Sequence, residues 1–357
     1  IEYYPGKDIS NEIVKDADAL IIRTRTKCNE KLLSGTSVKI ITTATIGYDH
    51  IDIKYCDDHN IKWINAPGCN ATSVMQYVAS AMLNVANKSD FYLLEKTIGI
   101  VGVGNVGRKV QRLAENFGMR ILLNDPPRER IEGSKDFCSL ETIMEESDII
   151  TLHVPLIENG IDRTFHLLDN EFFENLSRSS ILINTSRGEV IESSALKKAI
   201  EGNKVNNVVL DVWENEPDVD LQLLEITEIA TPHIAGYSAD GKANGTSVCV
   251  RAINEFFELG IQNNWYPPNI PDAEYGNSLT IDGKNKYDQV IFTEAILPTY
   301  DVIKDDTNFR KNPAEFELLR GNYPNRREFT NYQIELVHCH TRIIEKLINL
   351  NFNIKCN

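Results

Sequence analysis

The stretch IGIVGVGNVG, residues 98–107, places an apolar β-branched run directly before three glycines spaced G-x-G-x-x-G. The run predicts a buried strand, and the apolar positions Val106, Val110, Leu113 and Phe117 predict a helix after it. In such a loop the first glycine permits a tight turn, the second lets the backbone approach a pyrophosphate, and the third lets the helix pack on the strand. The loop therefore predicts a dinucleotide site at a helix N-terminus, with the residues Gly102, Gly104, Asn105, Val106 and Gly107.

A second apolar run ends at Asp125, eighteen residues beyond Gly107. A carboxylate at the end of this second strand is expected to accept hydrogen bonds from the adenosine ribose hydroxyls. It would also repel the 2′-phosphate of NADP, so the sequence favours NAD as the cofactor. Arg128 follows closely and leaves NADP open, because a guanidinium can hold a 2′-phosphate.

Apolar β-branched runs alternate with helix-period stretches through most of the chain, which predicts an α/β fold with a parallel sheet. Six strand candidates make one doubly wound (Rossmann) sheet: 98–101, 121–123, 149–152, 181–183, 208–210 and 229–230. Three strand candidates come before them, at 1–4, 19–22 and 38–43, and helices are expected over 74–85 and 242–259. We predict an NAD-binding domain over residues 73–236 and a smaller flavodoxin-like substrate lobe from 1–72 and 237–264.

The proline-rich stretch 266–271 predicts a linker, and residues 265–357 a small C-terminal α+β dimerisation domain. Its strand candidates are 279–281 and 332–336, and its helix candidates are 289–302 and 343–350. About ninety residues have little interior of their own, so some of the surface formed by its apolar stripes is expected to be buried against a second copy. These stripes are Val290, Ala295 and Leu297, then Ile343, Leu347 and Leu350.

Charged residues of this region are expected to be accessible. The turn with Arg326 and Arg327 is its densest basic spot, and it could reach a phosphate in the partner's site. The pair Asp305-Asp306 is expected to be solvated helix charge.

The composition narrows the class of protein. A formal net charge of −15 opposes a sequence-independent grip on nucleic acid or on an anionic membrane. No apolar run approaches the roughly 18–20 residues that span a bilayer, and no signal peptide is visible, so a cytoplasmic protein is expected.

The seven cysteines are expected to be reduced thiols, and His338-Cys339-His340 lacks the further ligands of a structural metal site. Because the chain starts at Ile1 without a Met and opens on a strand-like run, we expect that an upstream segment is missing.

Three polar motifs follow successive strand candidates: NTSRG at 184–188, DVWENEP at 211–217 and TPHIAGY at 231–237. The carboxyl ends of parallel strands share one edge of the sheet, where open α/β sheets bind ligands. Moving a hydride from a secondary alcohol to a nicotinamide needs a base for the proton, a cation for a substrate carboxylate, and a group that orients the base. His233, Arg187 and Glu216 supply one of each, and the Glu216 carboxylate would favour the protonated imidazole.

Together these motifs resemble the D-2-hydroxyacid dehydrogenases. Finer features resemble the branch of that family that carries an extra C-terminal domain: APGCNA at 66–71, DPPR at 125–128, HIAGYS at 233–238 and LRGNYPNRRE at 319–328. The resemblance spans the whole chain. It implies oxidation of 4-phospho-D-erythronate by NAD to 3-hydroxy-2-oxo-4-phosphooxybutanoate, on the route to pyridoxal 5′-phosphate.

The resemblance also implies further site residues. For NAD they are Val154, Thr185, Ser186, Asp211 and Gly236, and for the substrate they are Thr24, Thr45 and Tyr237. Val154 stands where the family often has a hydroxyl, so only a backbone contact would survive there. Arg23 joins the substrate set because a basic cluster follows its strand and could bind the phosphate.

Two alternatives remain open. A phosphoglycerate dehydrogenase, whose substrate is one carbon shorter, is the alternative among enzymes. An NAD(H)-sensing corepressor of the C-terminal-binding-protein type shares the fold and is the alternative from another class. Turnover of the two phospho-acids separates the two enzymes, and an NADH absorbance assay separates an enzyme from the corepressor.

Overall fold

The computed structural model describes residues 1–133, 135–273 and 276–356, and the chain divides into two compact units. Unit 1 contains Ile1–Ala71 and Ser238–Pro271, and unit 2 contains Thr72–Tyr237 and Asp272–Asn357. The boundaries of the three predicted domains stay predictions.

Unit 1 is built on a three-stranded parallel sheet in the order β1-β2-β3. The strands are β1 (Ala19–Ile22), β2 (Ile40–Thr43) and β3 (Lys62–Ile64). Short helices α1 (Asn11–Val14), α2 (Glu30–Leu33) and α3 (Ile53–Asp58) accompany them, and the long helix α11 (Ala239–Phe257) packs on β2. Gly245 permits that approach, because a Cβ there would lie 2.9 Å from the Ala44 carbonyl oxygen.

The predicted strand over residues 1–4 is wrong. These residues are exposed and belong to no strand, and Pro5 follows them. An apolar β-branched run becomes a strand only where a neighbouring strand can take its backbone hydrogen bonds.

Unit 2 is built on a six-stranded parallel sheet in the order β5-β4-β6-β7-β8-β9. Its strands are β4 (Thr97–Val101), β5 (Arg120–Asn124), β6 (Ile149–Leu152), β7 (Ser180–Asn184), β8 (Val205–Leu210) and β9 (Ile229–Ala230). The prediction of a doubly wound sheet is therefore confirmed. The strand order reverses at β4, so the crevice beyond β4 and β6 is where such a sheet binds its ligand.

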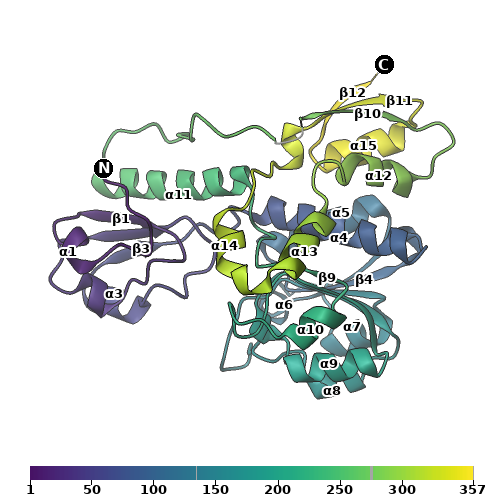
Figure 1. Ribbon diagram of the computed structural model, residues 1–357, viewed down its shortest axis with the longest axis horizontal. Coiled ribbons are helices and arrows are strands. Elements are labelled where there is room, and N and C mark those ends of the chain that lie inside the picture. The colour runs from purple at the N-terminus through teal and green to yellow at the C-terminus, as the bar shows by residue number, and fades with distance from the viewer. Residues whose placement is uncertain (134, 274–275, 357) are drawn as a thin grey trace. The chain divides into compact units, whose positions relative to one another are not determined.

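Alternate side chains of these strands enter two separate cores. Ile98, Ile100 and Ile183 join α4 (Ala71–Lys88) and α5 (Asn105–Phe117) on one face. On the other face Leu152 and Leu182 join α7 (Leu140–Glu146), α8 (Asn170–Glu174), α9 (Ser193–Glu201) and α10 (Leu221–Ile226). Figure 1 shows α4 and α5 on one side of the sheet and α8, α9 and α10 on the other. The short helix α6 (Pro126–Glu132) follows β5.

The C-terminal part of unit 2 has its own parallel sheet, β10 (Ser278–Asp282), β11 (Gln333–Val337) and β12 (Asn353–Cys356), in that order. Its helices are α12 (Asp288–Ile296), α13 (Val302–Lys311), α14 (Phe316–Gly321) and α15 (Thr341–Asn349). Helices α12 and α15 share the core of α4 and α5, where the rings of Phe117 and Phe292 lie 4.9 Å apart, whereas Phe309 of α13 and Phe316 of α14 join the core on the other face of the large sheet. The predicted stripes are therefore mostly buried within their own chain: Ala295, Ile343, Leu347 and Leu350 are buried, while Val290 stays exposed.

The expectation that Asp305 and Asp306 are solvated is also wrong. Helix α13 lies against β9, the edge strand of the large sheet, and the Asp306 carboxylate accepts the Ala230 backbone N–H at 2.7 Å. Arg310 pairs with the same carboxylate at 2.8 Å. An edge strand has unpaired backbone groups, and Asp306 satisfies one of them. Across the described ranges, no helix is both long and apolar enough to cross a membrane.

Candidate active site

The three glycines after β4 serve three different steric needs. Gly102 has φ +87°, and a Cβ there would lie 2.7 Å from the His153 carbonyl carbon. A Cβ on Gly107 would lie 2.1 Å from the Gly102 carbonyl oxygen, so only glycine fits. A Cβ on Gly104 would meet no atom within 4 Å. The open space at Gly104, at the N-terminus of α5, fits the approach of a pyrophosphate.

Asp125 follows β5 and is tied to the same glycine loop. One carboxylate oxygen accepts the Val103 backbone N–H at 2.8 Å, and the other accepts the Arg128 N–H at 3.1 Å and so caps α6. The Arg128 guanidinium donates to the Val103 carbonyl at 2.6 Å and pairs with Glu132 at 2.7 Å. Because Arg128 already has these partners, it is poorly placed to receive a 2′-phosphate. The ribose contact of Asp125 stays a prediction.

Residues beyond β6 and β7 lie at the switch point of the sheet. The half-buried His153 ring bonds Thr151 at 3.0 Å through Nε2 and Thr185 at 3.3 Å through Nδ1. Burial lowers the pKa of His153 to about 3, so this ring stays neutral at physiological pH. Val154 lies over the first glycine of the loop, since a Cβ on Gly102 would approach its Cγ1 to 2.8 Å. His153 belongs to none of the sequence motifs, although it precedes Val154 directly.

The turn after β7 presents Arg187. The buried Asn184 side chain donates to the Arg187 carbonyl at 2.9 Å and accepts from the Ser186 N–H and hydroxyl at 3.0 and 2.8 Å. A Cβ on Gly188 would lie 2.0 Å from the Trp213 carbonyl carbon, so the turn fits tightly against the loop after β8. The half-buried Arg187 side chain donates to the Ser186 carbonyl at 2.7 Å. Asn184 therefore shapes this turn, a role that its place in the motif did not reveal.

His233 and Glu216 form the predicted pair. His233 Nδ1 lies 2.8 Å from a Glu216 oxygen, and the other oxygen accepts the Trp213 N–H at 2.9 Å. Burial raises the pKa of the Glu216 carboxyl, but His233 and these hydrogen bonds outweigh it and hold that pKa below its usual value. Glu216 is therefore an anion that holds Nδ1, which leaves Nε2 to exchange a proton with a substrate.

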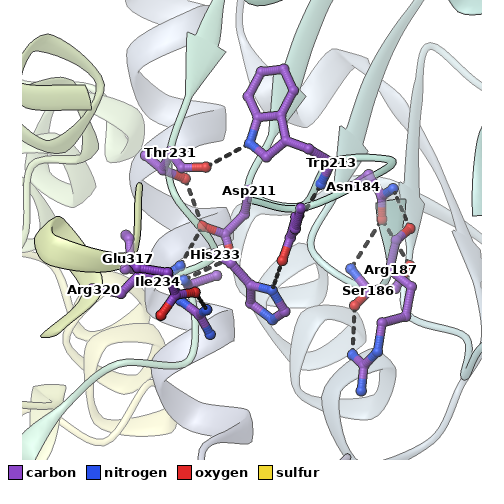
Figure 2. Close-up of polar contacts among 12 residues, drawn as sticks. Asn184, Ser186, Arg187, Asp211, Trp213, Thr231, His233, Ile234, Glu317 and Arg320 are labelled. Carbon is purple, nitrogen blue, oxygen red and sulfur yellow. Dashed lines mark hydrogen bonds and ion pairs between the residues drawn. The ribbon is translucent and has the colours of Figure 1, made fainter. Parts of the chain in front are cut away.

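Asp211 fixes the loop that carries His233. Its carboxylate is 1% exposed and accepts the Thr231 hydroxyl at 2.6 Å and the Ile234 and Ala235 N–H groups at 2.7 and 2.8 Å. The His233 N–H donates to the Asp211 carbonyl at 2.7 Å. Burial raises the pKa of this carboxyl. Its contact with NAD stays a prediction, because the structure shows it engaged by the loop (Figure 2).

The C-terminal region contacts the same loop from the other side. Arg326 is 5% exposed, its guanidinium lies 4.2 Å from the Tyr300 ring centroid, and it donates to the Ala235 carbonyl. Arg327 is buried as well, and its carbonyl accepts from Gln76 of α4 at 3.0 Å. The expectation of an accessible basic turn is therefore wrong, because the chain's own residues enclose both side chains. Its contact with a partner's site stays a prediction.

The remaining predicted residues are distributed between the two units. Tyr237 lies in unit 2, with its ring 5.8 Å from that of Tyr323. Arg23, Thr24 and Thr45 lie in unit 1, where Arg23 and Thr24 are exposed and the Thr45 hydroxyl donates to the Gly47 carbonyl at 2.8 Å. In the part of the chain that the structure describes, no three His, Cys, Asp or Glu side chains are grouped to hold a metal ion.

Comparisons with known proteins agree with this site. Residues 74–235 match the family described as D-isomer specific 2-hydroxyacid dehydrogenase, NAD binding domain, and residues 274–349 match a domain of unknown function. The erythronate-4-phosphate dehydrogenase of Bacteroides thetaiotaomicron is 52% identical over 335 residues, 93% of this chain and 92% of that protein. The one from Porphyromonas gingivalis is 42% identical over 94% of this chain and 89% of its own length.

Solved structures show the same fold. The 3-phosphoglycerate dehydrogenase of Entamoeba histolytica with bound NAD⁺ gives a TM-score of 0.62 at 28% identity, over 76% of this chain and 89% of that one. The D-lactate dehydrogenase of Aquifex aeolicus, complexed with NAD and lactic acid, gives 0.60 at 26% identity, over 72% and 88%. This chain therefore belongs to the erythronate-4-phosphate dehydrogenases, NAD-dependent oxidoreductases within the D-isomer-specific 2-hydroxyacid dehydrogenase family.

Proposed function

We propose that this enzyme oxidises the C2 hydroxyl of 4-phospho-D-erythronate, giving 3-hydroxy-2-oxo-4-phosphooxybutanoate on the route to pyridoxal 5′-phosphate. The substrate is taken from the name of relatives that are 52% and 42% identical over more than nine-tenths of this chain. NAD supplies the hydride acceptor, and the residues that would hold it are the glycine loop, Asp125, Val154, Thr185, Ser186, Asp211 and Gly236.

His233 is the proposed general base. Its Nε2 takes the hydroxyl proton while Glu216, 2.8 Å from Nδ1, orients the ring and stabilises the imidazolium that forms. Arg187 binds the substrate carboxylate, because a guanidinium fork matches a carboxylate and keeps its charge. Arg23, Thr24, Thr45 and Tyr237 complete the proposed substrate contacts. The reverse reaction begins with the imidazolium, which returns the proton.

The main support for oxidation of a hydroxyl group with NAD is the His233–Glu216 pair, which lies on the strand-end loops of a dinucleotide-binding sheet. The test is formation of NADH with 4-phospho-D-erythronate, 3-phosphoglycerate and D-erythronate as substrates. We expect the highest kcat/KM with 4-phospho-D-erythronate. A higher kcat/KM with 3-phosphoglycerate would contradict the proposal, and no turnover of any of the three would favour the corepressor alternative.

We further propose that the enzyme is a cytoplasmic homodimer that pairs through the region after residue 264. The exposed Tyr287 of this region supports this, since it borders a depression in the surface together with the exposed Tyr92 and Leu94 of the preceding domain, and the rings of Tyr92 and Tyr287 lie 5.7 Å apart. Light scattering of the full chain should give a dimer mass, and the double variant Leu94→Ser with Tyr287→Ser should give a monomer. A monomeric wild type contradicts the proposal.

A further inference from the structure

Arg320 is a largely buried cation whose hydrogen bonds are incomplete. It lies in α14, and its side chain is only 13% exposed. One terminal nitrogen donates to Glu317 at 2.7 Å, but the buried Nε has no hydrogen-bond partner. A buried guanidinium N–H without an acceptor is unusual in a folded chain, and it indicates that an anionic or polar group is still to be received.

The Arg320 side chain lies beside the catalytic loop. Its guanidinium carbon is 5.7 Å from the centroid of Tyr237, a proposed substrate contact, and 5.6 Å from that of Phe316. Burial raises the pKa of Glu216, and the charge of Arg320 is among the contributions that oppose this rise. The positive charge of Arg320 therefore favours the ionised form of Glu216, although Arg320 comes from a helix far along the chain.

The two arginines of this site stand on different sides of the base. Figure 2 shows Arg187 and Arg320 on opposite sides of the His233 ring, with Arg320 entering from α14. The substrate of the proposed function has the matching order of groups: a carboxylate at one end, the reacting hydroxyl beside it, and a phosphate at the other end. If Arg187 holds the carboxylate and His233 faces the hydroxyl, the phosphate extends toward the side of Arg320.

We propose that Arg320 binds the terminal phosphate of the substrate and sets the preference for a phosphorylated hydroxy acid. This inference rests on the proposed function. A guanidinium donates well to phosphate oxygens, and the Tyr237 and Phe316 rings, whose centroids lie 5.7 and 5.6 Å from the guanidinium carbon, hold it in place in advance. Arg320 thereby gives the doubly charged phosphate a local positive charge in a protein whose net charge is −15.

The test compares two substrates that differ only in the phosphate, 4-phospho-D-erythronate and D-erythronate. Wild type should prefer the phosphorylated acid in kcat/KM. Arg320→Gln should reduce that preference by about 10- to 100-fold, because a hydrogen bond to a charged group is lost. The KM for NAD should stay the same. Arg320→Met, which keeps an unbranched side chain between the two rings, should give the same result and replaces Arg320→Gln if that variant does not fold.

Arg310→Gln is the matched control. Arg310 is another partly buried arginine of this region, but it pairs with Asp306 and caps α10 through the Leu224 carbonyl at 2.6 Å. Its loss should lower stability and leave the phosphate preference unchanged. A preference that persists in the folded Arg320 variants overturns this inference alone. A wild type that oxidises neither acid overturns the proposed function instead, so the two failures are distinguishable.

Discussion

The strand-end loops of the large sheet and the C-terminal segment 313–332 both contact residues 231–237, but they do so with different interactions. The strand ends use short hydrogen bonds between neighbouring loops, such as Asp211 to the Ile234 N–H at 2.7 Å. The C-terminal segment uses buried cations over aromatic rings, with Arg326 4.2 Å from the Tyr300 centroid and Arg320 5.7 Å from the Tyr237 centroid.

The two regions also differ in exposure. The His233 side chain is 31% exposed and can meet a substrate, whereas Arg326 is 5% exposed and meets only its own chain. The difference shows that a residue that reacts with the substrate, such as His233, and a residue that only supports its loop, such as Arg326, can belong to separate regions of one molecule. Changes at His233 or Asp125 should alter rate or cofactor choice, and changes to the C-terminal residues that are enclosed by their own chain, such as Arg326 and Tyr323, should mainly alter stability.

The largest effect is expected for His233→Ala. Without the base, kcat should fall by about 10²- to 10⁴-fold, while NAD affinity stays largely unchanged. In the wild type, oxidation needs the neutral imidazole to accept the hydroxyl proton, whereas reduction needs the imidazolium to return it. Stopped-flow detection of NADH and calorimetric titration of NAD provide the two measurements. Equal rates for variant and wild type would remove His233 from the mechanism.

A pair of glycine variants separates folding from cofactor binding. Gly107→Ala places a Cβ 2.1 Å from the Gly102 carbonyl oxygen, so it should destabilise the protein by about 1–3 kcal/mol or more. Gly104→Ala meets no protein atom, so it should keep the melting temperature but weaken NAD binding, because the methyl occupies the space of the pyrophosphate. Calorimetry and NAD titration on both variants test this. Equal NAD affinity for Gly104→Ala and wild type would place the pyrophosphate elsewhere.

A smaller effect is expected for Asp125→Ser, about 10-fold in the preference for NAD over NADP. The ribose loses an acceptor and a 2′-phosphate loses a repelling charge. Asp125→Asn is the control, since it keeps an oxygen for the Val103 N–H, 2.8 Å away, without the charge. The ratio of kcat/KM for the two cofactors is the measurement, and an unchanged ratio in both variants would show that this carboxylate does not select the cofactor.

The sequence predicted the strand ends well because their signals are local. The β-branched runs, the spacing of Gly102, Gly104 and Gly107, and the order of Arg187, Glu216 and His233 each lie within a few residues of a strand. Strand pairing brings such motifs to one edge without any further information.

The C-terminal contacts could not be predicted in the same way. Arg326 looks solvated in a single sequence, and its acceptor, the Ala235 carbonyl, lies 91 residues earlier. Asp306 likewise depends on an unpaired amide of β9, which only the completed sheet defines. The run at residues 1–4 fails for the opposite reason, since its local pattern is right but no strand lies beside it.

The smallest effect should come from Tyr323→Phe, which removes one hydroxyl from the C-terminal support and keeps the ring beside Arg326 and Tyr237. That hydroxyl donates to Asp305 at 2.7 Å, and Tyr300 donates to the same oxygen at 2.8 Å. Loss of the hydroxyl should lower the free energy of unfolding by about 1 kcal/mol, which shifts the melting temperature down by roughly 2–4 °C, and should leave kcat unchanged.

The pH dependence of that stability loss identifies Asp305 as the partner. Burial outweighs the two tyrosine hydrogen bonds and raises the pKa of the Asp305 carboxyl, so the stability that comes from its raised pKa is present in acid and lost as pH rises through the folded pKa. Losing Tyr323 removes a contribution that lowers this pKa, so the variant's pKa is higher still. The difference from wild type should be small in acid, where both carboxyls are protonated, and should grow as pH rises through the wild-type pKa. Tyr92→Phe, which removes a hydroxyl from an exposed tyrosine, should change neither the stability nor its pH dependence. A pH-independent difference for Tyr323→Phe would mean that the Tyr323 hydroxyl stabilises the fold without Asp305.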